Sequence, residues 1–100
     1  MGTSNPSWIF EACILSILAR KNAYAYELVK LCVLDISDAT VYSILRRLED
    51  KDFLSVSSET HNTRLRKIYS ITPTGLKQLS ELMDKWHTFQ RDINQILSPR

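Results

Sequence analysis

Apolar residues in this chain follow two different spacings, which predict two kinds of secondary structure. Spacings of three and four residues, typical of amphipathic helices, predict helices over residues 6–20, 23–34, 37–52 and 73–97. The runs at residues 53–60 and 64–71 read as strands, the second with clear alternation, and the segment 61–63 between them has the composition of a turn. The pattern therefore predicts a mainly α-helical protein with one two-stranded β-hairpin.

The third predicted helix has two unlike faces. Ser37 is a suitable N-cap, because its hydroxyl can accept a hydrogen bond from a first-turn amide, and Asp38 places negative charge at the positive end of the helix. One face is apolar and must enter a core: Val41, Ile44, Leu45 and Leu48. The opposite face and its flanks carry small, hydrogen-bonding and charged residues: Ala39, Thr40, Tyr42, Ser43, Arg46, Arg47 and Asp50.

This polar face has the composition of a helix that reads DNA. Small residues allow entry into the major groove, hydroxyl groups reach base edges, and arginines bind guanine or phosphate. An ordinary amphipathic helix with a solvated outer face shows the same pattern, so the neighbouring elements must distinguish the two. The helix over residues 23–34 and a tight connection at 35–36 precede it, which are the proportions of a helix-turn-helix.

The hairpin after this helix resembles the wing of a winged helix-turn-helix. Asp52 lies where the chain reverses, and aspartate tolerates the left-handed conformation that such a reversal needs. The second strand carries Arg64, Arg66 and Lys67 beside His61. These charges suit phosphate or minor-groove contacts, although basic residues also protect exposed strands from aggregation. The residues predicted to contact DNA are Ser37, Thr40, Tyr42, Ser43, Arg46, Arg47, Arg64, Arg66 and Lys67.

The last predicted helix begins at the cap Thr72 with Pro73 in its first turn, and ends before Ser98. About 25 residues at about 1.5 Å each give roughly 37 Å, which exceeds what a small head can cover. Its apolar seam suits a helix pair across a two-fold axis, while packing on its own core alone is the alternative. The first helix has apolar residues on more than one face and is expected to touch the partner too. The predicted dimer interface comprises Trp8, Phe10, Leu79, Leu82, Met83, Trp86, Phe89, Ile93 and Ile96.

Composition narrows the classes of function. The chain has 100 residues, 44% hydrophobic residues and a net charge of +2, which fits one small domain whose DNA affinity depends on local clusters of charge. Cys13 and Cys32 lack zinc-site spacing, so no metal or cofactor is expected, and buried reduced thiols are preferred over a disulfide. No phosphate loop or nucleophile motif is present, which argues against an enzyme. The apolar run from Trp8 to Ala19 contains Glu11 and is too short to span a membrane, so a cytoplasmic protein is expected.

Three ordered motifs resemble the PadR family of bacterial and archaeal transcriptional regulators. They are Ala25-Tyr26-Glu27-Leu28, the segment TVYSILRRLE at residues 40–49, and RLRKIYSIT at residues 64–72 followed by Gly75. The resemblance covers about residues 10–97 and implies a short-form regulator. Residues 1–72 would form a winged helix-turn-helix head, and residues 73–100 a C-terminal dimerisation helix.

The resemblance also implies repression of nearby genes in response to a small molecule or stress. The family usually has glycine where Ala25 and Asp52 stand, and the fold can accommodate both residues with slight strain. It often has proline at Ser43 and Leu65, which lie at or near the expected DNA surface, so this surface departs from the family pattern. In some members, aromatic side chains at the dimer interface stack on flat ligands. Such a small hydrophobic or phenolic effector would here contact Trp8, Trp86 and Phe89, although packing is the commoner role of such side chains.

Two functions from different classes follow. The first is a homodimer that binds near-palindromic double-stranded DNA, with half-sites about one helical turn apart. The second is a winged-helix module that binds another regulator instead of DNA, because the net charge is near balance and Glu49, Asp50 and Asp52 closely follow the arginines of the third helix.

Overall fold

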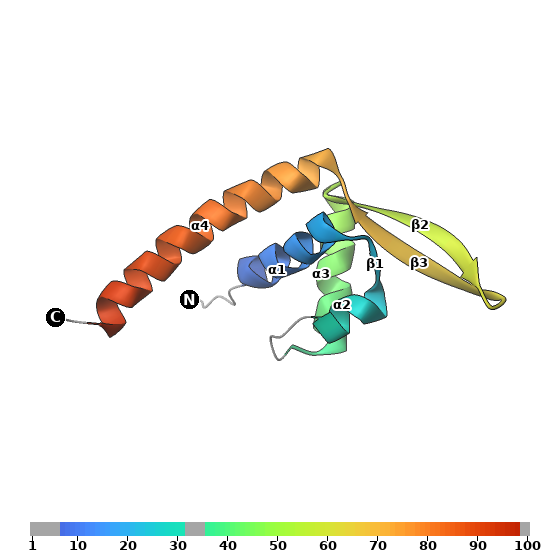
Figure 1. Ribbon diagram of the computed structural model, residues 1–100, viewed down its shortest axis with the longest axis horizontal. Helices are drawn as coiled ribbons and strands as arrows, with labels where there is room; N and C mark the ends of the chain where they lie inside the picture. The colour runs from blue at the N-terminus through green and yellow to red at the C-terminus, as the bar shows by residue number, and fades with distance from the viewer. Residues whose placement is uncertain (1–6, 32–35, 99–100) are drawn as a thin grey trace.

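The computed structural model of this chain describes residues 7–31 and 36–98. The elements, in chain order, are α1 (Ser7–Arg20), β1 (Ala23–Tyr24), α2 (Ala25–Leu31), α3 (Asp38–Asp50), β2 (Leu54–His61), β3 (Arg64–Ile71) and α4 (Pro73–Leu97). Figure 1 shows α1, α2 and α3 grouped together, with the β2–β3 hairpin projecting from one end and α4 extending past α1 toward the other. The molecule is therefore elongated, with extents of 60 × 27 × 26 Å.

The predicted starts of the third and fourth helices are confirmed. The Ser37 hydroxyl accepts a hydrogen bond from the Thr40 amide at 3.1 Å, so α3 begins as its sequence indicates. The Thr72 hydroxyl accepts one from the Gly75 amide at 2.9 Å, and Pro73 occupies the first turn of α4. The predicted start of α1 at Pro6 and the segment 32–35 lie outside the described residues.

The second predicted helix is wrong at its N-terminal end, because Ala23 and Tyr24 form a strand. They pair with β3 in antiparallel register, Ala23 opposite Tyr69 and Tyr24 opposite Ile68. The sheet order is β1-β3-β2, so the wing has three strands instead of two. The free edge of β3 offers backbone hydrogen bonds to this short segment, and α2 begins only at Ala25.

Two reversals of the chain use left-handed residues. Asp52, after α3, has φ 65°, as the sequence analysis predicts. Between β2 and β3, Asn62 and Thr63 have φ 53° and 65°. Positive φ at both residues of a two-residue loop twists the strands in the direction that hairpins prefer. This turn sets the register that places Glu59 opposite Arg66.

The core lies where the three head helices meet the base of the sheet. Every helix and strand contributes buried side chains to it: Ala12, Ile14, Leu15, Leu18, Ala23, Leu28, Val41, Ile44, Leu45, Leu48, Leu54, Tyr69 and Leu82. All four residues predicted for the apolar face of α3 belong to it, which confirms that prediction. The polar face of α3 is thereby turned away from the core.

The prediction that Leu82 lies at the dimer interface is wrong. Leu82 is 6% exposed and belongs to the core of its own protomer, where α4 packs against α1. Leu79 also packs against this core. The first half of α4 is therefore part of the head, and only its later turns extend beyond it (Figure 1).

Candidate nucleic-acid interface

The exposed face of α3 presents polar and aromatic side chains in successive turns. Tyr42 is 45% exposed, and Ser43 and Arg46 are also exposed, because Val41, Ile44 and Leu45 take the opposite face into the core. Ser37 and Thr40 lie at the N-terminus of α3, where their hydroxyl oxygens are 2.9 Å apart. This end of the helix therefore offers small hydrogen-bonding groups, with an aromatic ring and a guanidinium group in the following turns.

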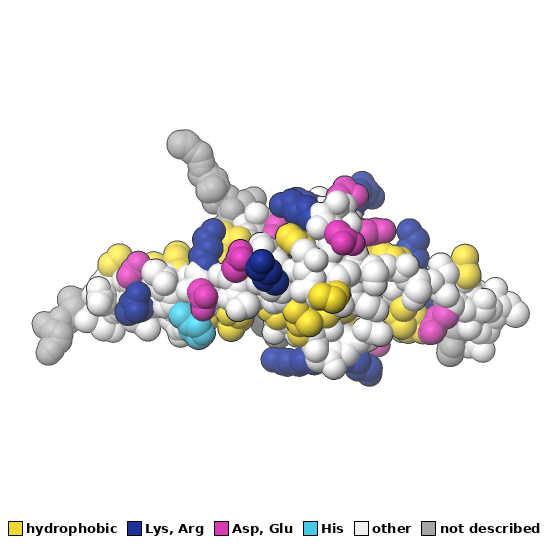
Figure 2. Space-filling view, turned by 90° about the horizontal axis from the view of Figure 1, so that it is seen from above, with side chains coloured by type: hydrophobic (Ala, Val, Ile, Leu, Met, Phe, Trp, Pro, Cys, Tyr) yellow, Lys and Arg dark blue, Asp and Glu magenta, His cyan; other side chains and the backbone are white. Residues whose placement is uncertain are grey.

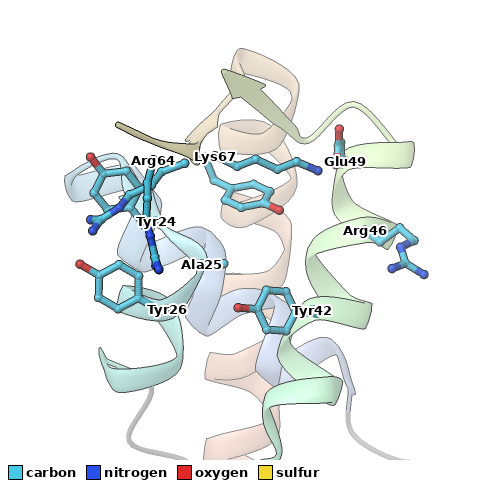
Figure 3. Close-up of a pocket in the computed structure, with 10 residues that line it drawn as sticks. Tyr24, Ala25, Tyr26, Tyr42, Arg46, Glu49, Arg64 and Lys67 are labelled. Carbon is cyan, nitrogen blue, oxygen red and sulfur yellow. The ribbon is translucent and has the colours of Figure 1, made fainter. Parts of the chain in front are cut away.

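The wing lies beside this face and closes a cleft of about 450 Å³. The cleft is lined by Tyr24, Ala25, Tyr26, Tyr42, Arg46, Glu49, Arg64, Arg66, Lys67 and Tyr69. Figure 3 shows Tyr42 and Arg46 extending from α3, Lys67 reaching across from the wing, and Tyr24 and Tyr26 on the far side. The structure therefore brings five of the nine predicted DNA contacts together, from two elements separated in sequence.

Five residues that line the cleft were not predicted to contact DNA: Tyr24, Ala25, Tyr26, Glu49 and Tyr69. Tyr24 and Tyr26 belong to β1 and α2, and their rings stack with centroids 5.9 Å apart and planes 10° from parallel. The alternation of two tyrosines across Ala25 was the available signal. The spacing in this segment instead predicts a helix from residue 23, because the pairing of β1 with β3 depends on residues more than forty positions away.

The environment of Tyr69 keeps its phenol neutral. Burial raises the pKa of Tyr69, and the negative charge of Glu49 adds to this effect, while Arg46 opposes it. A raised pKa in the folded state means that the neutral phenol contributes stability below about pH 10, which is lost as the pH rises through the folded-state pKa. Tyr69 therefore adds no negative charge to the cleft, whose charged lining consists of four basic side chains and Glu49.

Arg47 differs from its predicted position. The periodicity of α3 predicts that Arg47 lies on the DNA-facing side, but its guanidinium group binds Glu11 on α1. Its Nη2 and Nε atoms donate to one carboxylate oxygen of Glu11 at 2.7 and 3.0 Å. The Glu11 side chain is 12% exposed, so the carboxylate needs this partner. We conclude that Arg47 fastens α3 to α1.

Replacing Glu11 with glutamine is expected to lower the free energy of unfolding by about 1 kcal/mol, because a half-buried charge-assisted pair is lost while Arg47 retains partial access to water. Urea denaturation measures the effect. The variant E81Q removes an exposed carboxylate on α4 and should change little. The double variant E11Q/R47Q should be no less stable than E11Q, and additive losses would contradict the pairing.

An aromatic cluster joins α1 to α4 on the other side of the head. The Trp8 and Phe89 rings meet edge to face with centroids 5.8 Å apart, and Trp86 lies 6.2 Å from Phe89. The Lys85 ammonium group lies 4.7 Å from the centre of the Trp8 ring. The three residues predicted to contact a flat ligand are thus neighbours within one protomer.

Apolar side chains are also exposed along α4, most of all at its C-terminal end. Ile96 and Leu97 are 71% and 73% exposed, and Phe89 and Met83 are exposed to a lesser extent. Figure 2 shows exposed apolar side chains continuing toward the C-terminal end of α4, with charges of both signs between them. Of the other residues in the predicted interface, Trp8, Phe10, Trp86 and Ile93 are half-buried in the protomer.

The described residues contain no helix that is both long enough and apolar enough to cross a membrane. Within the same ranges, no three histidine, cysteine or acidic side chains are grouped to hold a metal ion. Cys13 is half-buried, and Cys32 lies outside the described residues.

A helix-turn-helix followed by a β-hairpin, with a cleft between them, defines a winged helix-turn-helix protein. The sequence profile of the PadR-like family of transcriptional regulators matches residues 14–81. The chain therefore belongs to the PadR-like family of transcriptional regulators, as its motifs indicate.

Solved structures of related proteins share the fold. A Streptococcus mutans protein has a TM-score of 0.85 and 31% identity, covering 100% of this chain and 96% of that one. A PadR-like transcriptional regulator from Bacillus cereus has a TM-score of 0.79 and 28% identity, covering 92% of this chain and 94% of that one. PadR from Bacillus subtilis, solved in complex with operator DNA, has a TM-score of 0.70 and 18% identity, covering 75% of this chain and 46% of that one.

Proposed function

We propose that this protein is a homodimeric transcriptional regulator that binds a near-palindromic DNA operator and represses transcription. The observation that carries the proposal is the cleft that Tyr42 and Arg46 of α3 line together with Arg64 and Lys67 of the wing. A recognition helix in the major groove, with basic wing residues on the adjacent backbone, would use both walls of this cleft. The fold is shared with a PadR protein that was solved with operator DNA, which supports this use of the surface.

The dimer would be built on α4. Its exposed Phe89, Ile96 and Leu97 would be buried against the partner's helix, which accounts for apolar surface that the protomer leaves in water. Residues 1–72 would act as the DNA-binding head, with the first half of α4 packed on it, and residues 73–100 would form the dimerisation segment through the later turns of α4. A two-fold axis would then present two recognition helices to half-sites about one helical turn apart.

Selection from random duplex DNA tests this proposal. The purified protein is mixed with the duplexes at near-physiological salt, and the retained sequences are read. We expect an enriched near-palindrome. Retention without enrichment would contradict sequence-specific recognition, and no retention would favour the alternative of a module that binds another regulator. As a DNA-binding regulator, the protein would act in the cytoplasm, and its cleft would bind without catalysing a reaction.

The two walls of the cleft are expected to respond differently to mutation. Replacing Arg64 with glutamine should weaken binding to all duplexes and lower the slope of log K against log salt by about 1, because one phosphate contact is lost. Replacing Tyr42 with alanine should cost about 1–3 kcal/mol of discrimination between the operator and a shuffled duplex. Fluorescence anisotropy at several salt concentrations measures both. Equal effects on operator and shuffled DNA for Y42A would contradict its role in reading bases.

The effector would be a small, flat hydrophobic or phenolic molecule at Trp8, Trp86 and Phe89. The support for this site is the meeting of three aromatic rings beside the exposed part of α4. Titration of tryptophan fluorescence with planar aromatic compounds tests it. No quenching up to their solubility limits would remove the effector site from the proposal.

A further inference from the structure

Arg66 lies among aromatic rings instead of extending freely into the cleft. Its guanidinium carbon is 5.3 Å from the centre of the Tyr24 ring and 5.7 Å from that of Tyr26. The two rings are themselves stacked. Arginine over tyrosine rings within about 6 Å is held by attraction between the cation and the ring electrons. Arg66 is half-buried, whereas Arg64 and Lys67 on the same strand are exposed.

The same tyrosine also reaches the other strand of the wing. The Tyr24 hydroxyl donates a hydrogen bond to the carboxylate of Glu59 on β2, and this bond is the main cause of the raised pKa of Tyr24. Glu59 is the cross-strand partner of Arg66. Tyr24 therefore contacts both strands of the hairpin at one cross-strand pair. Its ring contacts Arg66 on β3, and its hydroxyl binds Glu59 on β2. We call Tyr24, Tyr26, Glu59 and Arg66 the wing clamp.

The position of the wing clamp explains why the hairpin needs it. The last residue of β1 to pair with β3 is Tyr24, opposite Ile68, so from Lys67 toward the turn the wing has only two strands. A two-stranded hairpin is marginally stable in water unless it packs against another element. Arg66 lies in this two-stranded part, two residues closer to the turn than Ile68. The wing clamp ties this two-stranded part to β1 and to α2, which is the first helix of the helix-turn-helix.

We infer that Arg66 is a positioning residue, which holds the wing at a fixed angle to the recognition helix through the wing clamp and does not bind DNA phosphate itself. This inference rests on the proposed function. Two observations favour it over a phosphate contact: the guanidinium is engaged by two rings, and the carboxylate of Glu59 on the facing strand offsets its positive charge. Arg64 and Lys67 are then the phosphate-binding residues of β3.

The dependence of operator binding on salt distinguishes the two roles. A phosphate-binding arginine releases counterions, so its replacement lowers the slope of log K against log salt by about 1, as expected for R64Q. R66Q should instead weaken operator binding about tenfold with no change in slope. The free energy lost is that of ordering a mobile wing on binding, and no phosphate contact is removed. Tyr24→Leu should have the same effect, and R66Q/Y24L should bind no more weakly than either single variant. Lys77→Gln removes an exposed positive charge on α4, outside the cleft and the wing clamp, and should bind like the wild type.

A slope for R66Q that falls as it does for R64Q, or additive losses in R66Q/Y24L, would overturn the inference. Hydrogen exchange of the free protein gives a readout that does not need DNA. R66Q and Y24L should speed amide exchange at residues 58–67 severalfold, whereas R64Q should not, and unchanged exchange would also overturn the inference. If the wild-type protein retains no duplex, the proposed function fails, and exchange still decides whether Arg66 holds the wing.

Discussion

Replacing Gly75 with alanine is expected to lower the free energy of unfolding by about 3 kcal/mol or more. In an ordinary helix this change would stabilise by about 0.5–1 kcal/mol, because glycine is a poor helix former. Here a methyl group at residue 75 would lie 2.2 Å from the Phe53 carbonyl oxygen and 2.8 Å from Cγ1 of Ile71. Contact with backbone cannot be relieved by a rotamer change, so the steric cost exceeds the gain in helix propensity.

The backbone at this junction has little freedom to move. The Phe53 carbonyl accepts from the Thr72 amide at 3.0 Å, and the Thr72 hydroxyl donates to the Asp52 carbonyl at 2.7 Å. A shift of Phe53 would therefore weaken the connection between α3, β2 and the start of α4. Urea denaturation followed by circular dichroism measures the loss, with T74A as the control at an exposed neighbouring position. Stability of G75A within 1 kcal/mol of the wild type, on the order of a typical surface substitution, would contradict the prediction.

Replacing Ile96 with glutamate is expected to dissociate the proposed dimer while leaving the protomer folded. Ile96 is 71% exposed in the protomer, so the head loses no packing. In a helix pair built on the end of α4, the same position would be dehydrated, and an unpaired carboxylate there is strongly unfavourable. Separate heads lose the effective concentration that links two half-sites, so operator affinity should fall on the order of 100-fold or more.

Analytical ultracentrifugation and operator titration measure the two effects of I96E. Gln95→Glu is the matched control, because it adds the same charge at an adjacent exposed polar position. We expect Q95E to remain dimeric and to bind DNA nearly as the wild type does. An I96E protein that sediments as the wild type does would show that the subunits associate through another surface.

The helices with strong local signals could be predicted from sequence to within a residue or two. For α3 and α4, a capping hydroxyl at Ser37 and at Thr72 marks the start, and an apolar stripe marks the buried face, so all the information lies within each segment. The bounds of β3 were predicted correctly, because the alternation of side chains over residues 64–71 and the turn at Asn62 indicate the same start of the strand. Family motifs then added the class of protein, which periodicity alone does not give.

The errors share one physical cause, which is dependence on residues distant in sequence. Tyr24 is in a strand only because β3 passes beside it, and Arg47 turns inward only because Glu11 lies across the α1–α3 contact. Leu82 lies on the apolar stripe of α4, but whether a stripe faces its own core or a partner depends on how far the head extends along the helix. The contacts within the wing clamp could not be predicted for the same reason, because the stacking of Tyr24 on Tyr26 depends on the pairing of β1 with β3.

The packing of Leu82 in the core has a mechanical consequence for a regulator of this shape. Because α4 is anchored in the head by Leu82 and by the contact of Trp8 with Phe89, it is a stiff arm and not a flexible tether. In the proposed dimer, joined through such arms, the separation of the two recognition helices would depend on the angle between α1 and α4. A small molecule that changes this angle slightly at the aromatic cluster would shift both heads together, so the two half-sites would be released at the same time.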